Sequence, residues 1–189
     1  MKPTRVLLPI NSKGTTSACS DIAFGLARRF EAELEVLHPC PSPAQRLPYA
    51  TELSPLYFES YLDVGRKQLD FEEKQAIAWF EKVSADWTDV ECQLLTVEGL
   101  VGPAVAQRAK TADLCVLPIA AARDDEMFDE ARDAALFSSG RPVLFVPDEA
   151  GGPVGETVVI AWKDAAEAAR AVACAGPFLE EAQHVRLKK

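Results

Sequence analysis

The most constraining feature of the sequence is a regular alternation between short apolar runs and helix-prone segments. The runs have the length and the β-branched or aromatic content of buried strands. They are Arg5–Ile10, Glu33–His38, Val90–Val97, Leu114–Leu117 and Val143–Val146. Between them, apolar residues recur at helical spacing, as from Ala23 to Phe30. This alternation predicts an α/β fold, a doubly wound five-stranded parallel sheet with right-handed crossovers.

Proline and polar segments mark the interruptions. Five prolines from Pro39 to Pro55 predict a surface excursion without regular structure. A long helix is expected over Leu56 to Trp87, either continuous or bent near Gly65. The polar segment from about Asp124 to Phe137 is expected to form the helix before the fifth strand.

After a linker, the chain repeats its opening pattern. Residues 149–156 hold three glycines and a proline, a composition typical of linkers. Val158–Trp162 then matches Val6–Ile10, residues 165–182 resemble an alanine-rich helix, and His184–Leu187 matches the second strand. The repeat predicts a domain over residues 1–148 and a partial second copy over residues 157–189.

The partial copy poses a burial problem, because a lone βαβ unit cannot cover both faces of its strands. It is expected to dock on the first domain, to pair with another chain, or to belong to a longer product. The sequence leaves these three alternatives open.

Composition restricts the classes of partner. The net charge of −9 and a pI near 4.8 argue against nucleic acid and acidic membranes. The sequence shows no secretory signal and no apolar run of about 18 residues, so a cytoplasmic protein that does not span a membrane is expected. Five scattered cysteines and two histidines predict buried, reduced thiols and no zinc site.

The chain resembles the universal stress protein family in four segments: RVLLPIN, GLVGPAVAQRAKTADLCVLPIA, GRPVLFVP and TVVIAWKDAAEAARAV. The resemblance covers Arg5 to Pro147 as one domain, followed by part of a second, as in a tandem member with its second domain truncated. It implies a Rossmann-like fold of the adenine-nucleotide alpha-hydrolase-like class. It also implies a role in stress responses and dimerisation through the fifth strand.

One branch of this family binds ATP with an Asp after the first strand and a G-x2-G-x9-G-[S/T] motif after the fourth. Glycines there let the backbone approach phosphate oxygens, and the final hydroxyl donates to them. Here Asn11 replaces the Asp, and Pro118 and Ala121 replace the first two glycines. The final Gly-Ser falls on Asp129-Glu130 or on Ala131-Arg132, and the many acids of this segment would repel a triphosphate unless a cation bridged them.

The resemblance places the nucleotide cleft at Pro9, Asn11, His38, Pro118 and Ala121. Asn11 could bind a ligand or serve as a turn residue, and His38 could be a ligand or a structural residue; the second interpretation fits each pattern better. No catalytic residue, metal site or cofactor is therefore expected.

The leading hypothesis is a non-enzymatic regulatory or interaction protein of the stress response with a degenerate nucleotide site. It would form a homodimer or an intramolecular pseudo-dimer through Val143–Val146 and bind an unknown protein. The alternative is an adenine-nucleotide binder, with ATP or AMP and Mg²⁺, or a slow ATP hydrolase. A third possibility is a structural half of a tandem protein whose other domain carries the active site.

Overall fold

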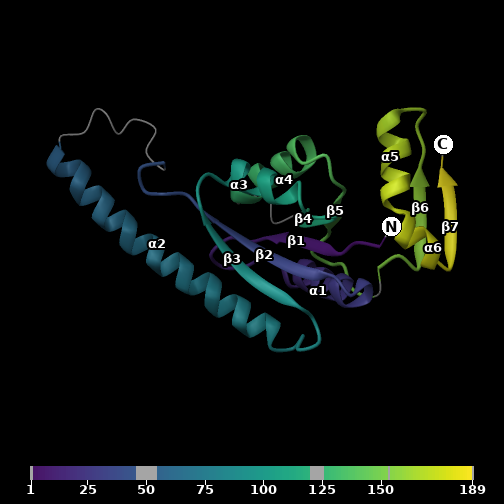
Figure 1. Cartoon of the computed structure of the whole chain (residues 1–189), viewed down its shortest axis with the longest axis horizontal. Coiled ribbons are helices and arrows are strands. Elements are labelled where there is room, and N and C mark those ends of the chain that lie inside the picture. Colours follow the sequence, from purple (N-terminus) through teal and green to yellow (C-terminus); the bar gives the residue numbers. More distant parts are fainter. Residues whose placement is uncertain (1, 46–54, 120–125, 153, 189) are drawn as a thin grey trace.

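The structure, a computed structural model, describes residues 2–45, 55–119, 126–152 and 154–188. Strands and helices alternate along the first domain, and a smaller unit follows it (Figure 1). The elements are β1 (Arg5–Pro9), α1 (Ser17–Phe30), β2 (Glu33–Cys40), α2 (Pro55–Ser84), β3 (Cys92–Glu98), α3 (Val101–Ala109), β4 (Leu114–Pro118), α4 (Glu126–Ser138), β5 (Val143–Val146), β6 (Thr157–Ala161), α5 (Ala166–Cys174), α6 (Gly176–Glu181) and β7 (His184–Lys188).

The first five strands form one parallel sheet in the order β3-β2-β1-β4-β5, which confirms the predicted fold. Helices α1 and α2 lie on one face, and α3 and α4 lie on the other (Figure 1). Alternate residues of β1 serve the two cores: Val6 and Leu8 pack with α1, whereas Leu7 packs with α3 and α4. Both faces are therefore covered, as a parallel sheet requires.

The order in which strands are added to the sheet reverses between β1 and β4: β2 and β3 lie on one side of β1, and β4 and β5 lie on the other. The β1–β2 ladder continues to the pair Pro9–Leu37, whereas the β1–β4 register holds only Val6–Leu114 and Leu7–Cys115. Pro9 has no N–H to donate, so it suits the point where β1 and β4 separate. This separation lies at the carboxyl ends of the strands, where open α/β sheets bind ligands.

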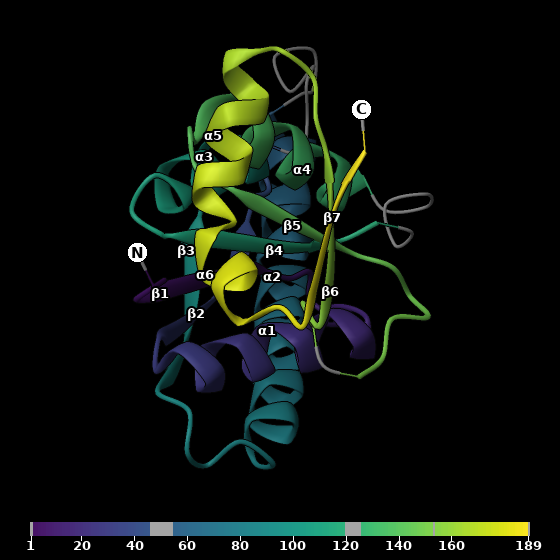
Figure 2. The same ribbon diagram turned by 90° about the vertical axis from the view of Figure 1, so that its right-hand side faces the viewer.

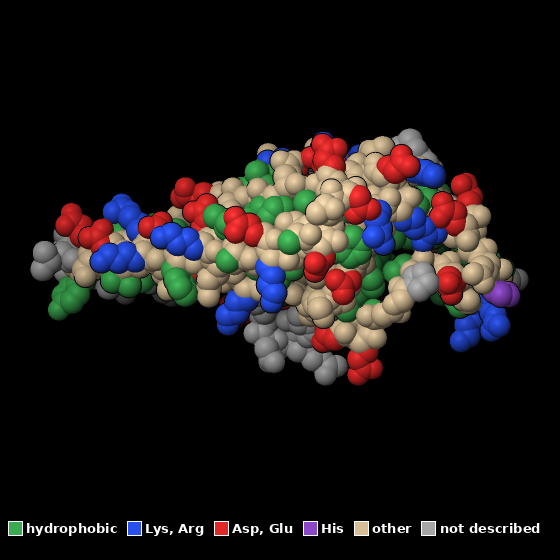
Figure 3. All heavy atoms as spheres, turned by 90° about the horizontal axis from the view of Figure 1, so that it is seen from below, with side chains coloured by type: hydrophobic (Ala, Val, Ile, Leu, Met, Phe, Trp, Pro, Cys, Tyr) green, Lys and Arg blue, Asp and Glu red, His purple; other side chains and the backbone are tan. Residues whose placement is uncertain are grey.

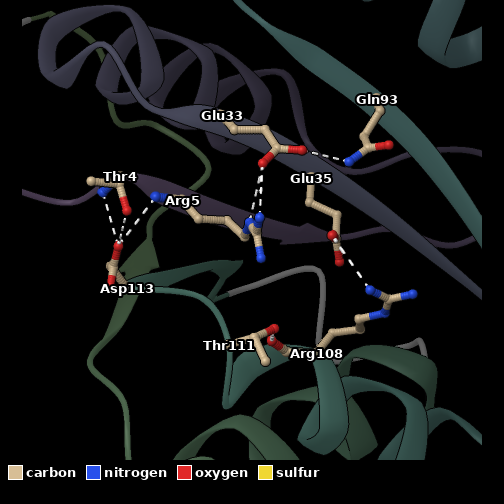
Figure 4. A network of polar contacts seen from close by, with 8 residues as sticks. All are labelled: Thr4, Arg5, Glu33, Glu35, Gln93, Arg108, Thr111 and Asp113. Atoms are coloured by element: carbon tan, nitrogen blue, oxygen red, sulfur yellow. Dashed lines mark hydrogen bonds and ion pairs between the residues drawn. The ribbon is translucent and has the colours of Figure 1, made fainter.

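A polar clamp holds the opposite edge of the sheet, where the strands begin (Figure 4). Asp113 accepts hydrogen bonds from Thr4 N at 2.9 Å, Thr4 Oγ1 at 2.8 Å and Arg5 N at 3.2 Å. The Arg5 guanidinium pairs with Glu33 at 3.1 Å, so the starts of β1, β2 and β4 are joined. Glu35, buried in β2, pairs with Arg108 of α3 at 3.7 Å and ties that helix to the sheet.

Several element boundaries differ from the predictions, and two of the differences involve a proline. Strand β2 continues through Pro39 and Cys40, which pair in register with Val97 and Glu98. Residues 46–54 of the segment expected to be irregular lie outside the described residues. The helix expected over residues 165–182 is instead two helices, α5 and α6, because Pro177 lies in the first turn of α6 and cannot continue α5.

The long helix α2 is continuous, although Gly65 was a possible bend. A Cβ atom on Gly65 would lie 2.5 Å from the Cβ of Pro43, so the glycine lets the loop after β2 pack against the helix. The thiols are only partly as predicted: Cys19, Cys40 and Cys115 are buried, Cys92 is half-buried and Cys174 is exposed. Burial raises the pKa of Cys19 to about 12.

The segment predicted as a partial repeat forms its own two-stranded parallel sheet, with Val158 opposite Val185. It lies at the end of the molecule next to β5 and α1 (Figures 1 and 2). Arg29 of α1 holds it: its guanidinium pairs with Glu181 at 2.7 Å and donates to the Val154 carbonyl at 2.6 Å.

Candidate functional site

A cleft of about 620 Å³ opens at the carboxyl ends of β1 and β2. Its walls come from the loops after these strands, from α2, and from the beginnings of α3 and α4. The lining residues are Asn11, Ser12, Lys13, His38, Pro39, Pro41, Gln45, Glu72, Leu100, Val101, Glu126, Met127 and Glu130. Its volume lies within the roughly 300–1,000 Å³ of small-molecule sites.

Asn11 is a turn residue in this structure. Its side-chain oxygen accepts a hydrogen bond from the backbone N–H of Lys13 at 2.8 Å. Its own backbone exchanges two hydrogen bonds with Gly14, at 3.1 and 3.0 Å. This is the geometry by which Asn stabilises a turn locally. The oxygen that would replace the carboxylate of a ligand-binding Asp therefore already supports the loop.

Gly14 fixes the position of this loop against α2. Its φ is +93°, and a Cβ atom there would lie 2.1 Å from Nε1 of Trp79. A residue with a side chain would thus meet both backbone strain and a clash. The indole of Trp79 packs where that side chain would be, so the loop and α2 form one wall.

His38 is the most buried polar residue of the cleft, with 2% of its surface exposed. It lies near the end of β2, opposite Thr96 of β3. The structure therefore brings Asn11 and His38, two of the predicted site residues, to the same cleft.

The other predicted positions do not line this cleft. Pro9 and Pro118 are buried at the ends of β1 and β4, where they pair with Leu37 and Val146. Ala121 lies outside the described residues.

The charge of the cleft is unfavourable for phosphate. Among its described lining residues, Lys13 is the one Lys or Arg, against the carboxylates of Glu72, Glu126 and Glu130. Three carboxylates would repel a triphosphate more strongly than one lysine would attract it. In the described residues, no group of three or more His, Cys, Asp or Glu side chains is arranged to hold a metal ion.

One feature of the cleft does favour an anion. Helix α3 begins at its wall, and Leu100, the residue before the helix, provides no side-chain cap. The first N–H groups of a helix carry partial positive charge. This favourable element is weak, because it lies in the same cleft as three carboxylates.

Several lining residues were missed from the sequence. Glu72 comes from the middle of α2, and Gln45 from the loop before it, so their place depends on how the long helix crosses the sheet. Lys13 follows the first strand closely, and Glu130 belongs to the acidic segment before the fifth strand. Their spacing from the strand ends was the one available signal.

Charged side chains of both signs are mixed on one face of the molecule. On the face shown in Figure 3, Lys and Arg side chains are interspersed with Asp and Glu, most clearly along α2, and form no large basic patch. Within the described ranges, no helix is both long and apolar enough to cross a membrane.

Comparison with known proteins gives similarity in structure rather than in sequence. No protein-family model matches the sequence, and no curated protein is significantly similar to it. A universal stress protein from Archaeoglobus fulgidus DSM 4304 aligns with a TM-score of 0.63 and 14% identity, over 99% of this chain and 68% of that one. Universal stress protein UspA from Lactobacillus plantarum aligns with a TM-score of 0.58 and 15% identity, over 77% of this chain and 99% of that one.

A third similar structure is a universal stress protein in complex with cAMP. It aligns with a TM-score of 0.51 and 15% identity, over 77% of this chain and 98% of that one. The fold of the chain is therefore that of the universal stress proteins, as the sequence resemblance implied.

Proposed function

We propose that this chain is a universal stress-type regulatory protein that acts through protein contacts and whose cleft does not bind ATP. The observation that carries the proposal is the composition of the cleft: its described lining residues include one lysine against three carboxylates, and the Asn11 oxygen is engaged in its own loop. A phosphate-binding loop would instead present backbone N–H groups and cations to the ligand. The chain would act in the cytoplasm and as a non-enzyme.

Isothermal titration with ATP, ADP and AMP in the presence of Mg²⁺ tests this proposal. We expect no heat of binding at the concentrations used for nucleotide-binding proteins. A matched variant, Glu126→Lys with Glu130→Lys, replaces two of the repelling carboxylates, and we expect it to bind ATP more tightly than the wild type. Low-micromolar binding by the wild-type protein would contradict the proposal.

A second candidate function is binding of an adenine nucleotide with a single phosphate group, or slow ATP hydrolysis. Three observations favour it: the cleft volume of about 620 Å³, the uncapped start of α3, and a similar structure that is a complex with cAMP. In the binding version, AMP or cAMP would bind more tightly than ATP, whereas the hydrolase version requires that ATP itself binds. Phosphate release above background that is lost in Asn11→Ala would support the hydrolase version.

Protein contacts through β5 are part of the leading proposal. In the described part of the chain, the outer edge of β5 has no strand beside it, and its sequence Val-Leu-Phe-Val has no charge. Uncharged edges of this kind are prone to pair with another strand.

A further inference from the structure

Helix α2 is long for the sheet that it covers. Its 30 residues span about 45 Å, whereas β2, with eight residues, spans about 26 Å. The α2 residues that join the core come from its later part: Ala76, Trp79, Phe80 and Val83. Figure 1 shows the earlier part running past the sheet, away from the other helices. The earlier part of α2 therefore offers a surface of its own.

This earlier part carries an exposed apolar stripe, formed by Tyr57, Val64 and Phe71. The three residues are 73%, 64% and 56% exposed, and they belong to neither hydrophobic core of the described chain. Their seven-residue spacing, with Tyr61 between the first two, is that of a coiled-coil seam. A surface helix ordinarily has one apolar stripe, which faces its own core. The second stripe of α2 indicates that another helix packs on it.

Charged residues of both signs border the stripe on one flank. Lys67 lies four residues after Asp63, so the two side chains project on the same side of the helix. Asp63 pairs with Arg66 of its own helix at 3.2 Å, yet 71% of its side chain is exposed. Lys67 is exposed and has no ion pair among the described residues. The flank therefore offers both an acceptor and a donor to a second helix.

A second copy of the same helix complements this surface when it lies antiparallel, with Val64 of each copy at the two-fold axis. Tyr57 of one copy then lies opposite Phe71 of the other, because the two residues are equally far from Val64. Two-fold symmetry brings the same flank of both helices together. Lys67 of each copy is then about 3 Å along the axis from Asp63 of the other. The surface is thus complementary to itself in shape of stripe and in charge.

The position of the rest of the chain favours the antiparallel direction. The sheet and the other helices lie toward the later part of α2 (Figure 1). Antiparallel pairing of the earlier parts places the two sheets at opposite ends, whereas parallel pairing would press them against each other. Helix α2 packs on β2 and β3, at the opposite edge of the sheet from β5. The stripe is therefore a separate surface from the β5 edge.

We propose that the Tyr57–Phe71 stripe of α2 is a self-association surface, on which a second copy of this chain packs its own α2 antiparallel. A buried aromatic ring covers roughly 150–250 Å². The partly exposed rings of Tyr57 and Phe71 from two copies therefore give an interface at the low end of specific interfaces, below about 1,200 Å². The expected dimer is one that dissociates on dilution.

Sedimentation equilibrium of the full chain over a dilution series tests the proposal. We expect a mass that rises above that of the monomer as the concentration increases. Val64→Lys and Phe71→Lys each place a charge in the seam and are expected to raise the dissociation constant about tenfold or more. Glu73→Lys is the matched control, because it introduces the same residue at an exposed position on the other side of the helix. Circular dichroism checks that every variant is folded.

A charge exchange tests the flank. Lys67→Glu sets a carboxylate opposite Asp63 of the other copy and is expected to weaken the dimer severalfold. Adding Asp63→Lys to this variant reverses both charges and is expected to restore the wild-type dissociation constant. A flank that took no part in the contact would leave both variants equal to the wild type.

Crosslinking tests the direction of the two helices. The background is Cys174→Ser, because Cys174 is exposed. Under mild oxidation we expect Val64→Cys to form a disulfide-linked dimer, since residue 64 lies at the two-fold axis. Tyr57→Cys is expected to remain unlinked, because the two copies of residue 57 would be about 21 Å apart along the axis, beyond the reach of a disulfide. Parallel helices would link both variants.

Three results would overturn the proposal. The first is a wild-type chain that stays monomeric at every concentration, which would leave the stripe to a different partner. The second is an association that Val64→Lys and Phe71→Lys leave unchanged. The third is Tyr57→Cys crosslinking as readily as Val64→Cys. Assemblies larger than a dimer that Val64→Lys reduces to dimers would support the proposal and assign the remaining contact to another surface.

Discussion

The strand–helix–strand unit that opens the chain and the one predicted as its partial copy have the same order of elements and very different surroundings. In β1, residues Val6 to Pro9 are all buried, whereas β6 alternates between half-buried and exposed residues. Helix α1 has eight buried residues, whereas α5 has none. The same strand–helix–strand order thus exists once as the centre of a covered sheet and once as a two-stranded unit at the end of the molecule.

The difference shows what local sequence decides and what it leaves to neighbours. Apolar runs and an alanine-rich helix are enough to set the elements in both copies. Burial depends on the strands and helices beside them: β1 lies between β2 and β4, whereas β6 has only β7. Most of the stability of a helix or a strand comes from such tertiary packing. The partial copy therefore carries apolar side chains without a core to receive them.

The largest predicted effect comes from truncating matched side chains in the two first strands. Leu7 and Val159 occupy equivalent places, but Leu7 is 1% exposed and Val159 is 55% exposed. Leu7→Ala is expected to lower the free energy of unfolding by about 2–5 kcal/mol, because it leaves a cavity between β1 and α3. Val159→Ala is expected to change it by less than about 0.5 kcal/mol. Urea denaturation followed by circular dichroism measures both.

The contrast between β1 and β6 would be contradicted if Val159→Ala lowered the free energy of unfolding as much as Leu7→Ala. That result would mean that β6 is buried in solution, against another part of the assembly.

The next effect concerns the clamp at the strand starts of the first sheet. Burial raises the pKa of Asp113, but the hydrogen bonds from Thr4 and Arg5 and the charge of Arg141 outweigh it and hold the pKa below its ordinary value. A lowered folded pKa means that the carboxylate adds stability above the unfolded pKa, and that this stability is lost as the pH falls through the folded pKa. Asp113→Asn is expected to cost about 1.5–3 kcal/mol at neutral pH and almost nothing in strong acid.

Urea denaturation at neutral pH and at acidic pH checks this dependence. Asp63→Asn, on the exposed surface of α2, is the control, because 71% of the Asp63 side chain is exposed. The prediction is contradicted if Asp113→Asn and Asp63→Asn lower the free energy of unfolding by the same amount at both pH values. The clamp would then contribute no specific interaction.

Much of the fold could be predicted from the sequence because the central strands β1 and β4 are covered on both faces. Such strands are continuous apolar runs, which stand out without any long-range information. Two of the incorrect boundaries lie at prolines. Pro39 was read as the end of regular structure, although β2 continues to Cys40. The break at Pro177 was overlooked within a run of alanines.

Less of the cleft could be predicted. Asn11 and His38 follow from their places at strand ends, because parallel strands bring their carboxyl ends together. Glu72 could not be found this way, since it reaches the cleft only through the packing of α2 across the sheet. The contact between Gly14 and Trp79 is of the same kind. Long-range packing of a surface helix leaves no local signal in the sequence.

The smallest predicted effect concerns the contact that joins the two copies. Arg29 pairs with Glu181 and donates to the Val154 carbonyl, and the neighbouring Phe30 meets Phe178 edge-on at 5.4 Å. The ion pair is partly exposed, so Arg29→Ala is expected to lower the overall stability by about 1 kcal/mol or less. Its local effect is larger: the amides of β6 and β7 should exchange hydrogen faster, whereas those of β1 and β2 stay unchanged.

Hydrogen exchange followed by mass spectrometry separates these two regions. Arg66→Ala is the matched control, because Arg66 also pairs with a carboxylate, Asp63 at 3.2 Å, but does so on exposed α2 away from the partial repeat. It should leave both sheets as protected as in the wild type. Equal protection of β6 and β7 in Arg29→Ala would show that the partial repeat is held by other contacts. Faster exchange throughout the chain would show that the two copies unfold as one unit.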